Sequence, residues 1–122
     1  MSKYKKNIGN AGEDVAEKYL IEKGYKIIER NYRVGRMGEV DILASDKDYL
    51  VAVEVKTRKD ENYGSPFSAI NYKKMKTLHN LAKVLLLRFQ DFKNFRFDVI
   101  GIILKNNQVE KIKLIKNAFL VK

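Results

Sequence analysis

Two apolar, strand-like segments of this sequence carry charged side chains where an ordinary core strand would not. Gly38-Glu39-Val40-Asp41 opens one segment, and Val53-Glu54-Val55-Lys56 closes the next. Carboxylates and a lysine in such segments are costly unless a partner compensates their charge, so the fold must bring a partner to them. A divalent metal ion is the partner that best explains all three groups. The leading hypothesis is therefore a metal-dependent phosphodiesterase site.

The length and composition predict one folded domain. The chain has 122 residues, of which 45% are hydrophobic, and this is enough for one core but not for two. One proline, seven glycines and no repeats leave no evident linker. We expect a short, flexible basic arm over residues 1–8 and a single compact domain over residues 9–122.

Several classes of site are excluded by residues that the sequence lacks. It has no cysteine, which rules out disulfides, thiolate zinc sites and cysteine nucleophiles. Its one histidine, His79, lies in a long amphipathic segment, so a Ser-His-Asp triad and sites built on paired histidines are also excluded. Because no apolar run approaches the roughly 18 residues of a membrane span, and no signal peptide is evident, we expect a soluble, cytoplasmic protein.

The charge is unevenly distributed along the chain. The net charge is +10, yet residues 39–66 carry seven acidic and only four basic side chains. An acidic island within a basic chain suits a protein that attracts a polyanion and also holds a cation. The alternative explanation of the charge, taken alone, is a generally basic proteome in which solvated lysines have no functional meaning.

Hydrophobic periodicity and turn residues predict the order α-β-β-β-α-β-β. The first helix is expected to start at an Asn10 cap and to end at Gly24, and the second to run from Pro66 to about Phe89. Strands are expected at 25–34, 39–45, 49–57, 95–104 and 109–115. Asn106-Asn107 should form the last hairpin turn, because Asn accepts a positive φ. This order predicts a three-layer α/β domain with a central mixed β-sheet flanked by helices.

Side-chain alternation predicts which charged groups meet. Along the third strand, Glu54 and Lys56 share a face with Leu50 and Ala52, while the alternate residues point the other way. Asp41 on the neighbouring strand can then converge with Glu54. Two carboxylates and the Val55 carbonyl would make a hard-oxygen site suited to Mg²⁺ or Mn²⁺.

Lys56 should lie on the metal side of its strand, where its ammonium group can orient a water nucleophile or stabilise charge on a phosphate. The alternative is an ordinary surface ion pair between Glu54 and Lys56.

Glu13 allows two interpretations of equal weight. At the margin of the buried helical stripe it could be a further metal ligand, or it could complete a capping box with Asn10. Candidate phosphate contacts, for which a solvated surface is the alternative, are Arg33, Arg36, Arg58, Lys59, Lys73 and Lys74.

Together these residues resemble the PD-(D/E)XK nuclease superfamily, in particular archaeal Holliday-junction resolvases. The wider pattern resembles the small bacterial YraN family of endonuclease-like proteins and spans about residues 9–120. It consists of Gly12-Glu13, Asn31-Tyr32-Arg33, Gly38-Glu39-Val40-Asp41, Val53-Glu54-Val55-Lys56-Thr57-Arg58, Gly64, Lys74, Ala82, Phe97-Asp98 and Asn117-Ala118-Phe119. Val40 stands where the broad superfamily often has proline.

The resemblance implies a restriction-endonuclease-like fold with Asp41 and Glu54 as metal ligands, Lys56 as the catalytic lysine, and Glu13 and Lys74 in supporting roles. We expect a Mg²⁺- or Mn²⁺-dependent endodeoxyribonuclease that prefers branched or non-B DNA. The main alternative is a binding module of the same fold that is inactive or needs a partner, and a pure protein-interaction role comes third. Because similar resolvases work as two-fold dimers, the expectation extends to a homodimer, although no stretch of sequence identifies its interface.

Overall fold

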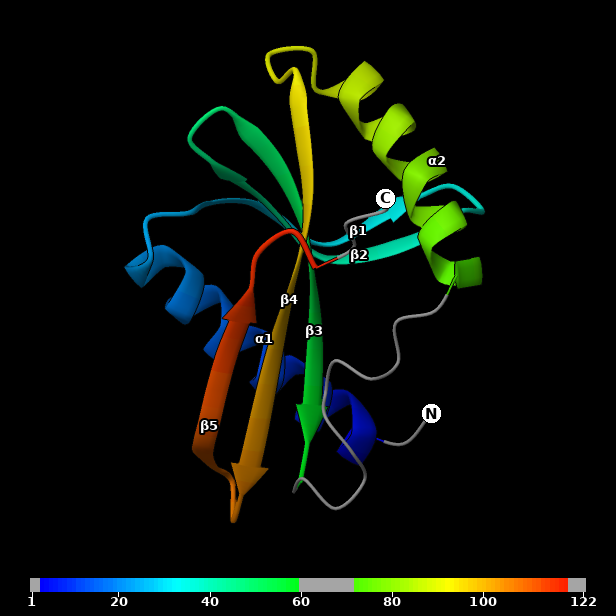
Figure 1. Cartoon of the computed structure of the whole chain (residues 1–122). Helices are drawn as coiled ribbons and strands as arrows, with labels where there is room; N and C mark the ends of the chain where they lie inside the picture. Colours follow the sequence, from blue (N-terminus) through cyan, green and yellow to red (C-terminus); the bar gives the residue numbers. More distant parts are fainter. Residues whose placement is uncertain (1–2, 60–71, 119–122) are drawn as a thin grey trace.

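The computed structural model describes the backbone of residues 3–59 and 72–118, and the side chains of residues 11–59 and 77–118. Within these ranges the elements follow the predicted order α-β-β-β-α-β-β (Figure 1). They are α1 (Lys3–Glu22), β1 (Lys26–Val34), β2 (Gly38–Asp46), β3 (Tyr49–Arg58), α2 (Tyr72–Arg88), β4 (Asn94–Lys105) and β5 (Gln108–Ile115). The described part contains no helix that is long and apolar enough to cross a membrane.

The five strands form one mixed sheet in the order β1-β2-β3-β4-β5. Neighbouring strands run antiparallel except β3 and β4, which are parallel. A parallel pair needs a crossover connection, and α2 lies in the connection between these two strands. The prediction of a mixed sheet is confirmed.

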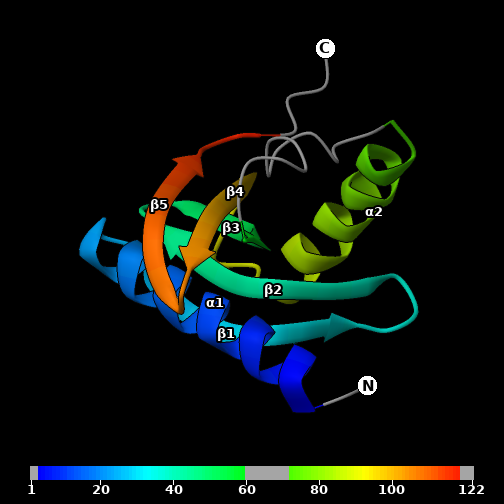
Figure 2. The same cartoon turned by 90° about the horizontal axis from the view of Figure 1, so that it is seen from below.

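The two helices pack on opposite faces of the sheet (Figure 2). On one face, Ala16 and Leu20 of α1 pack in a cluster that includes Val51 and Val53 of β3. On the other face, a second cluster contains Leu81 and Leu85 of α2 with Leu43, Leu50 and Ala52 of the sheet. The alternation predicted for β3 is thus confirmed, and so is the three-layer architecture.

The turn predicted at Asn106-Asn107 is confirmed. Asn106 and Asn107 have φ values of 55° and 62° and join β4 to β5. Positive φ at both central residues matches the right-handed twist of the flanking strands. At the β2–β3 turn, Lys47 also has a positive φ, of 57°. The predicted start of the second helix at Pro66 lies outside the described residues.

The predicted start of the first helix is wrong. Helix α1 begins at Lys3, so Asn10 lies inside it and does not serve as the N-cap. Helical hydrogen bonding continues through Asn10 and leaves no free N-terminal N–H for a capping box at this point. Of the two interpretations of Glu13, the capping box is therefore excluded.

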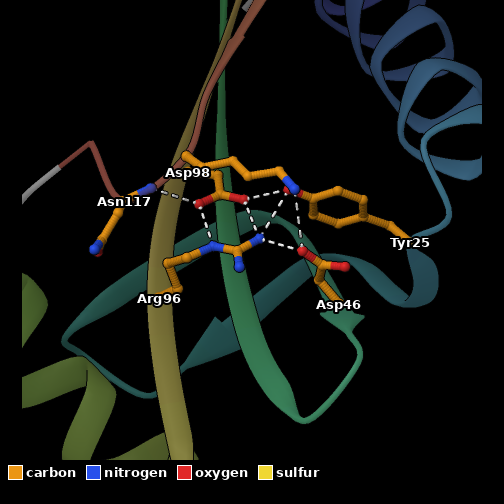
Figure 3. Close-up of polar contacts among 6 residues, drawn as sticks. Tyr25, Asp46, Arg96, Asp98 and Asn117 are labelled. Atoms are coloured by element: carbon orange, nitrogen blue, oxygen red, sulfur yellow. Dashed lines mark hydrogen bonds and ion pairs between the residues drawn. The ribbon is translucent and has the colours of Figure 1, made fainter.

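A buried polar network fixes β4 relative to the rest of the domain (Figure 3). Asp98 is fully buried and accepts four hydrogen bonds: from the Tyr25 hydroxyl at 2.6 Å, from Arg96 Nε at 2.9 Å and Nη2 at 3.0 Å, and from the Asn117 N–H at 2.9 Å. Arg96 Nη2 also donates to Asp46 Oδ2 at 2.8 Å. The network therefore joins β4 to the start of β1, the end of β2 and the segment after β5.

The charges in this network stabilise one another. Burial would lower the pKa of Arg96, but its hydrogen bonds to Asp98 and Asp46 outweigh this effect and raise it. The hydrogen bond from Arg96 lowers the pKa of Asp46. Burial, followed by the bond to Asp98, raises the pKa of Tyr25. Arg96 and Asp98 hence form a compensated buried ion pair in the folded state.

Candidate active site

Asp41 lies at the point where β2 and β3 separate. Paired residues of the two strands run from Asp46 opposite Tyr49 to Ile42 opposite Val53, and the ladder stops there. Beyond this pair, the Val55 N–H donates to the side chain of Asp41, at 2.8 Å from Oδ2. The Asp41 carboxylate thus accepts the Val55 N–H, and this hydrogen bond holds it where the two strands separate.

The environment of Asp41 favours its protonated form. Burial, above all, raises the pKa of this carboxyl from 3.8 to about 6, and the negative charges of Glu13 and Glu54 add to the rise. The Val55 N–H and the Lys56 ammonium act in the opposite direction. Three carboxylates consequently share one electrostatic environment, although they come from α1, β2 and β3.

The side chains of Glu54 and Lys56 project from the same face of β3, as predicted. Lys56 Nζ lies 2.9 Å from Glu54 Oε1, and both side chains are about three-quarters buried, with 23% and 24% exposure. The ordinary ion pair considered as an alternative is thus present in the structure. It is not an isolated surface pair, because both groups also act on the pKa of Asp41.

Glu13 is held in place by β1. Its Oε1 accepts from Asn31 Nδ2 at 3.1 Å and from Arg30 Nη2 at 3.4 Å, and the side chain is 14% exposed. Asn31 adopts a left-handed φ of 54°, close to an irregularity in the β1–β2 register. Arg30 also bonds Asp14 at 2.5 Å, and this bond is the main cause that raises the pKa of Arg30.

A glycine allows α1 to approach the site so closely. A Cβ added to Gly12 would overlap the Thr57 hydroxyl of β3, so a larger residue could not occupy this position without a shift. The close approach lets the adjacent Glu13 lie near the end of β3. The sequence pattern Gly12-Glu13 therefore has a steric reason as well as a chemical one.

The donor set suits a hard divalent cation. The carboxylates of Asp41 and Glu54 and the Val55 carbonyl supply oxygen, the ligand type that Mg²⁺ and Mn²⁺ prefer. Clustering of acidic groups is a second indication, since burial above all raises the pKa of Asp41, the charges of Glu13 and Glu54 add to the rise, and a bound cation would offset that repulsion. Within the described residues, no group of three carboxylate or imidazole side chains is arranged to hold an ion. A cation here would need water or substrate oxygens to complete its shell, as is usual for Mg²⁺.

The predicted phosphate contacts are spread around this centre. Arg33 and Arg36 are exposed on and beside the β1–β2 hairpin, and Lys59 is exposed just after β3. Arg58 is half-buried and donates through Nη1 to the Thr57 carbonyl at 3.0 Å. Lys73 and Lys74 belong to the first turn of α2, but their side chains lie outside the described part.

A small pocket lies beside the carboxylates, on the α2 face of the sheet. Its volume is about 90 Å³. Its walls are largely apolar, and Asp41 and Glu54 belong to its lining together with Glu39, Val40, Ala52, Val53, Leu78, Leu81 and Phe97. Sequence reasoning did not predict this pocket or the roles of Arg30 and Asn31. The only signal for Asn31 was its place in the Asn31-Tyr32-Arg33 motif.

The raised pKa of Asp41 predicts a pH-dependent effect of Asp41→Asn in metal-free protein. The folded state binds this proton more tightly than the unfolded state, so wild-type stability should fall as pH rises from about 4 to about 6. A pKa raised from 3.8 to about 6 corresponds to roughly 3 kcal/mol as an upper value. The Asn variant should therefore be more stable above pH 6 and about equal near pH 4.

Chemical denaturation between pH 4 and pH 8, in the presence of a chelator, would measure this difference. Asp48→Asn, which changes an exposed carboxylate that accepts from Asn94 at 3.2 Å, is the control and should show no such divergence. A stability difference for Asp41→Asn that does not change with pH would contradict the assignment.

Comparisons with known proteins show the family of this chain. The model of the family described as "uncharacterised protein family UPF0102" matches residues 12–102. The chain is 46% identical over 121 residues to a UPF0102 protein of Clostridium kluyveri, with 98% of each chain covered. It is 45% identical to UPF0102 proteins of Clostridium tetani, covering 98% of each chain, and of Clostridium botulinum strain 657, covering 93% of this chain and 94% of the relative.

Proposed function

We propose a nuclease function for this chain, which belongs to the UPF0102 (YraN) family. In this proposal the protein is a Mg²⁺- or Mn²⁺-dependent endonuclease that hydrolyses phosphodiester bonds in DNA. The observation that carries the proposal is the convergence of Asp41, Glu54 and Lys56 where β2 and β3 separate.

Each residue then has a distinct task. Asp41 and Glu54, with the Val55 carbonyl, would hold the cation, whose chemistry is to polarise the phosphate and activate water. The Val55 N–H orients the Asp41 carboxylate through the 2.8 Å hydrogen bond. Lys56 stabilises the negative charge that develops on the phosphate in the transition state. Glu13, held by Arg30 and Asn31, adds negative charge near the cation.

A binding module is the second candidate, and two contacts favour it. Lys56 already pairs with Glu54 at 2.9 Å, and Glu13 is already bound by Arg30 and Asn31. Catalysis would require these charges to act on a cation and a phosphate instead of on one another. A protein that needs a partner to loosen the pairs would bind nucleic acid but turn over slowly by itself.

The deciding experiment is a cleavage assay of purified protein with Mg²⁺, Mn²⁺ or a chelator. Linear duplex, single-stranded, flap and four-way-junction DNA should be offered in parallel, with matched RNA strands. Metal-dependent cutting of one or more forms supports the enzyme. Metal-independent binding without cutting supports the module, and sedimentation of the same samples would test the expected homodimer.

Metal binding provides a separate prediction. Calorimetry should detect Mg²⁺ or Mn²⁺ binding to the wild type, and Asp41→Asn or Glu54→Gln should each weaken it about tenfold or more, because each removes a charged ligand. Asp48→Asn, on an exposed carboxylate at the β2–β3 turn, should bind as the wild type does. Equal affinity in all four proteins would rule out this metal site.

The salt dependence of DNA binding would test whether the predicted basic residues contact phosphates. Each phosphate contact on duplex DNA contributes about 0.9 to the slope of log affinity against log salt. Arg33→Ala should flatten that slope by about one unit and weaken all sequences alike. Lys26→Ala is a matched control, because Lys26 is exposed at the opposite end of the same strand, β1. A slope that neither substitution changes would remove Arg33 from the interface.

A further inference from the structure

We infer that the pocket lined by Glu39, Asp41 and Glu54 is a subsite for one unstacked cytosine base of the nucleic acid strand. This inference rests on the proposed function and adds a specificity that the metal site itself does not provide. It follows from the charge of the pocket, its size and its position.

The charge of the lining leaves no place for a second phosphate beside the one at the proposed cation. Three of the described lining residues are acidic, the others are apolar, and none of them is basic. The cation at Asp41 and Glu54 would take the scissile phosphate, whereas the apolar part of the pocket offers a phosphate no positive partner and a neutral, planar group would lose little on entry there. A nucleobase is the part of a nucleic acid that has these properties.

The size of the pocket fits a single pyrimidine ring. A volume of about 90 Å³ is several times the roughly 10–15 Å³ that one water molecule needs, so the pocket has room for a small planar ring. Leu78 and Leu81 of α2 supply apolar wall, and Phe97 supplies an aromatic ring on which a base can stack.

Phe97 is well placed to keep that ring in position. It packs edge to face against Phe95, with ring centroids 4.7 Å apart and an interplanar angle of 66°. Neighbouring residues of the sheet therefore limit the orientations of its ring. A preorganised aromatic wall lowers the entropy lost when a base binds.

Glu39 selects among the pyrimidines. Glu39 belongs to the lining and is exposed, and its carboxylate can accept a hydrogen bond. Cytosine presents an amino group at N4, the donor that Glu and Asp recognise. Thymine and uracil present a carbonyl oxygen at the same position, which a carboxylate would repel.

Two residues common to the pocket and the proposed cation site place the base next to the reacting phosphate. Asp41 and Glu54 belong both to the pocket and to the proposed cation site, so the occupant must come from a nucleotide near the scissile bond. Unstacking a base costs a few kcal/mol in a paired duplex and least where the strand is single or mismatched. The pocket would hence favour single-stranded, flap or junction DNA over a regular duplex.

A fluorescent cytosine analogue tests the subsite without cleavage. Short single strands that carry one pyrrolocytosine at successive positions are mixed with the protein in Ca²⁺, and affinity and fluorescence are both measured. Fluorescence should change at one position only. Leu78→Trp, which fills the pocket, should abolish that change and weaken binding about tenfold, since one stacked base contributes about 1–3 kcal/mol. Leu87→Trp, at a side chain of α2 that is 72% exposed, is the control and should behave as the wild type does.

Glu39→Gln tests the selectivity at a surface position that does not endanger folding. The wild type should bind a strand with cytosine at the responsive position about tenfold more tightly than one with thymine, and Gln should reduce this ratio to near one. Unchanged fluorescence and selectivity in Leu78→Trp and Glu39→Gln, in a protein that still binds and cuts DNA, would overturn the subsite alone. Absence of binding to every strand would overturn both the subsite and the nuclease proposal.

Discussion

Lys56→Met should lower the rate of metal-dependent DNA cleavage by about 100- to 1,000-fold while DNA affinity changes only a few-fold. Removing one preorganised group that stabilises transition-state charge typically has an effect of this size. Methionine keeps most of the apolar stem of lysine, so packing along β3 should change little. Single-turnover kinetics at saturating protein would measure the chemical step separately from binding.

Two comparisons make the result specific to Lys56. Lys59→Met removes a positive charge from an exposed position three residues later, and it should reduce cleavage only slightly. The Lys56 variant also frees Glu54 from its 2.9 Å ion pair, so metal affinity should hold or increase. If cleavage and affinity fall in equal proportion, Lys56 is a phosphate contact and has no special role in the transition state.

Asp98→Asn should destabilise the domain by about 3–5 kcal/mol, the usual cost of breaking a buried ion pair from one side. Asp98 is fully buried, and its substitution leaves the Arg96 guanidinium, whose side chain is 11% exposed, with Asp46 as its remaining ionic partner among the residues whose side chains are described. The amide of Asn would also turn two donor hydrogens toward groups that already donate. Urea denaturation at neutral pH would measure the loss.

Two milder variants give reference values for this loss of stability. Tyr25→Phe removes one of the four donors to Asp98 and should cost about 1 kcal/mol. Asp48→Asn changes an exposed carboxylate and should stay within about 0.5 kcal/mol. Similar losses for Asp98→Asn and Asp48→Asn would mean that the network contributes little to stability.

The sequence predicted those features that are determined locally. Alternation along β3 correctly assigned Glu54 and Lys56 to one face, because side chains of a strand point to alternate sides whatever the rest of the fold. The turn at Asn106-Asn107 was predictable because few residues tolerate positive φ at two successive positions. Only such short-range rules were needed for the order of the elements.

Features that depend on distant contacts were not predictable in the same way. The start of α1 at Lys3 overrides the capping preference of Asn10. Tyr25 and Asp98 are 73 positions apart, and Arg30 and Glu13 are 17 apart, so no periodic pattern connects them. The pocket lies where the β2–β3 ladder stops, at Ile42 and Val53, and strand propensity alone does not specify where two strands part.

The contact between Gly12 and Thr57 leads to an expectation about sequence variation. Since a Cβ at position 12 would overlap the Thr57 hydroxyl, the two positions share one fixed volume between helix and strand. In related chains, we expect any residue larger than glycine at the first position to occur with alanine or glycine at the second. Such paired changes would show, across the family, how far helix α1, which carries Glu13, must lie from strand β3, which carries Lys56.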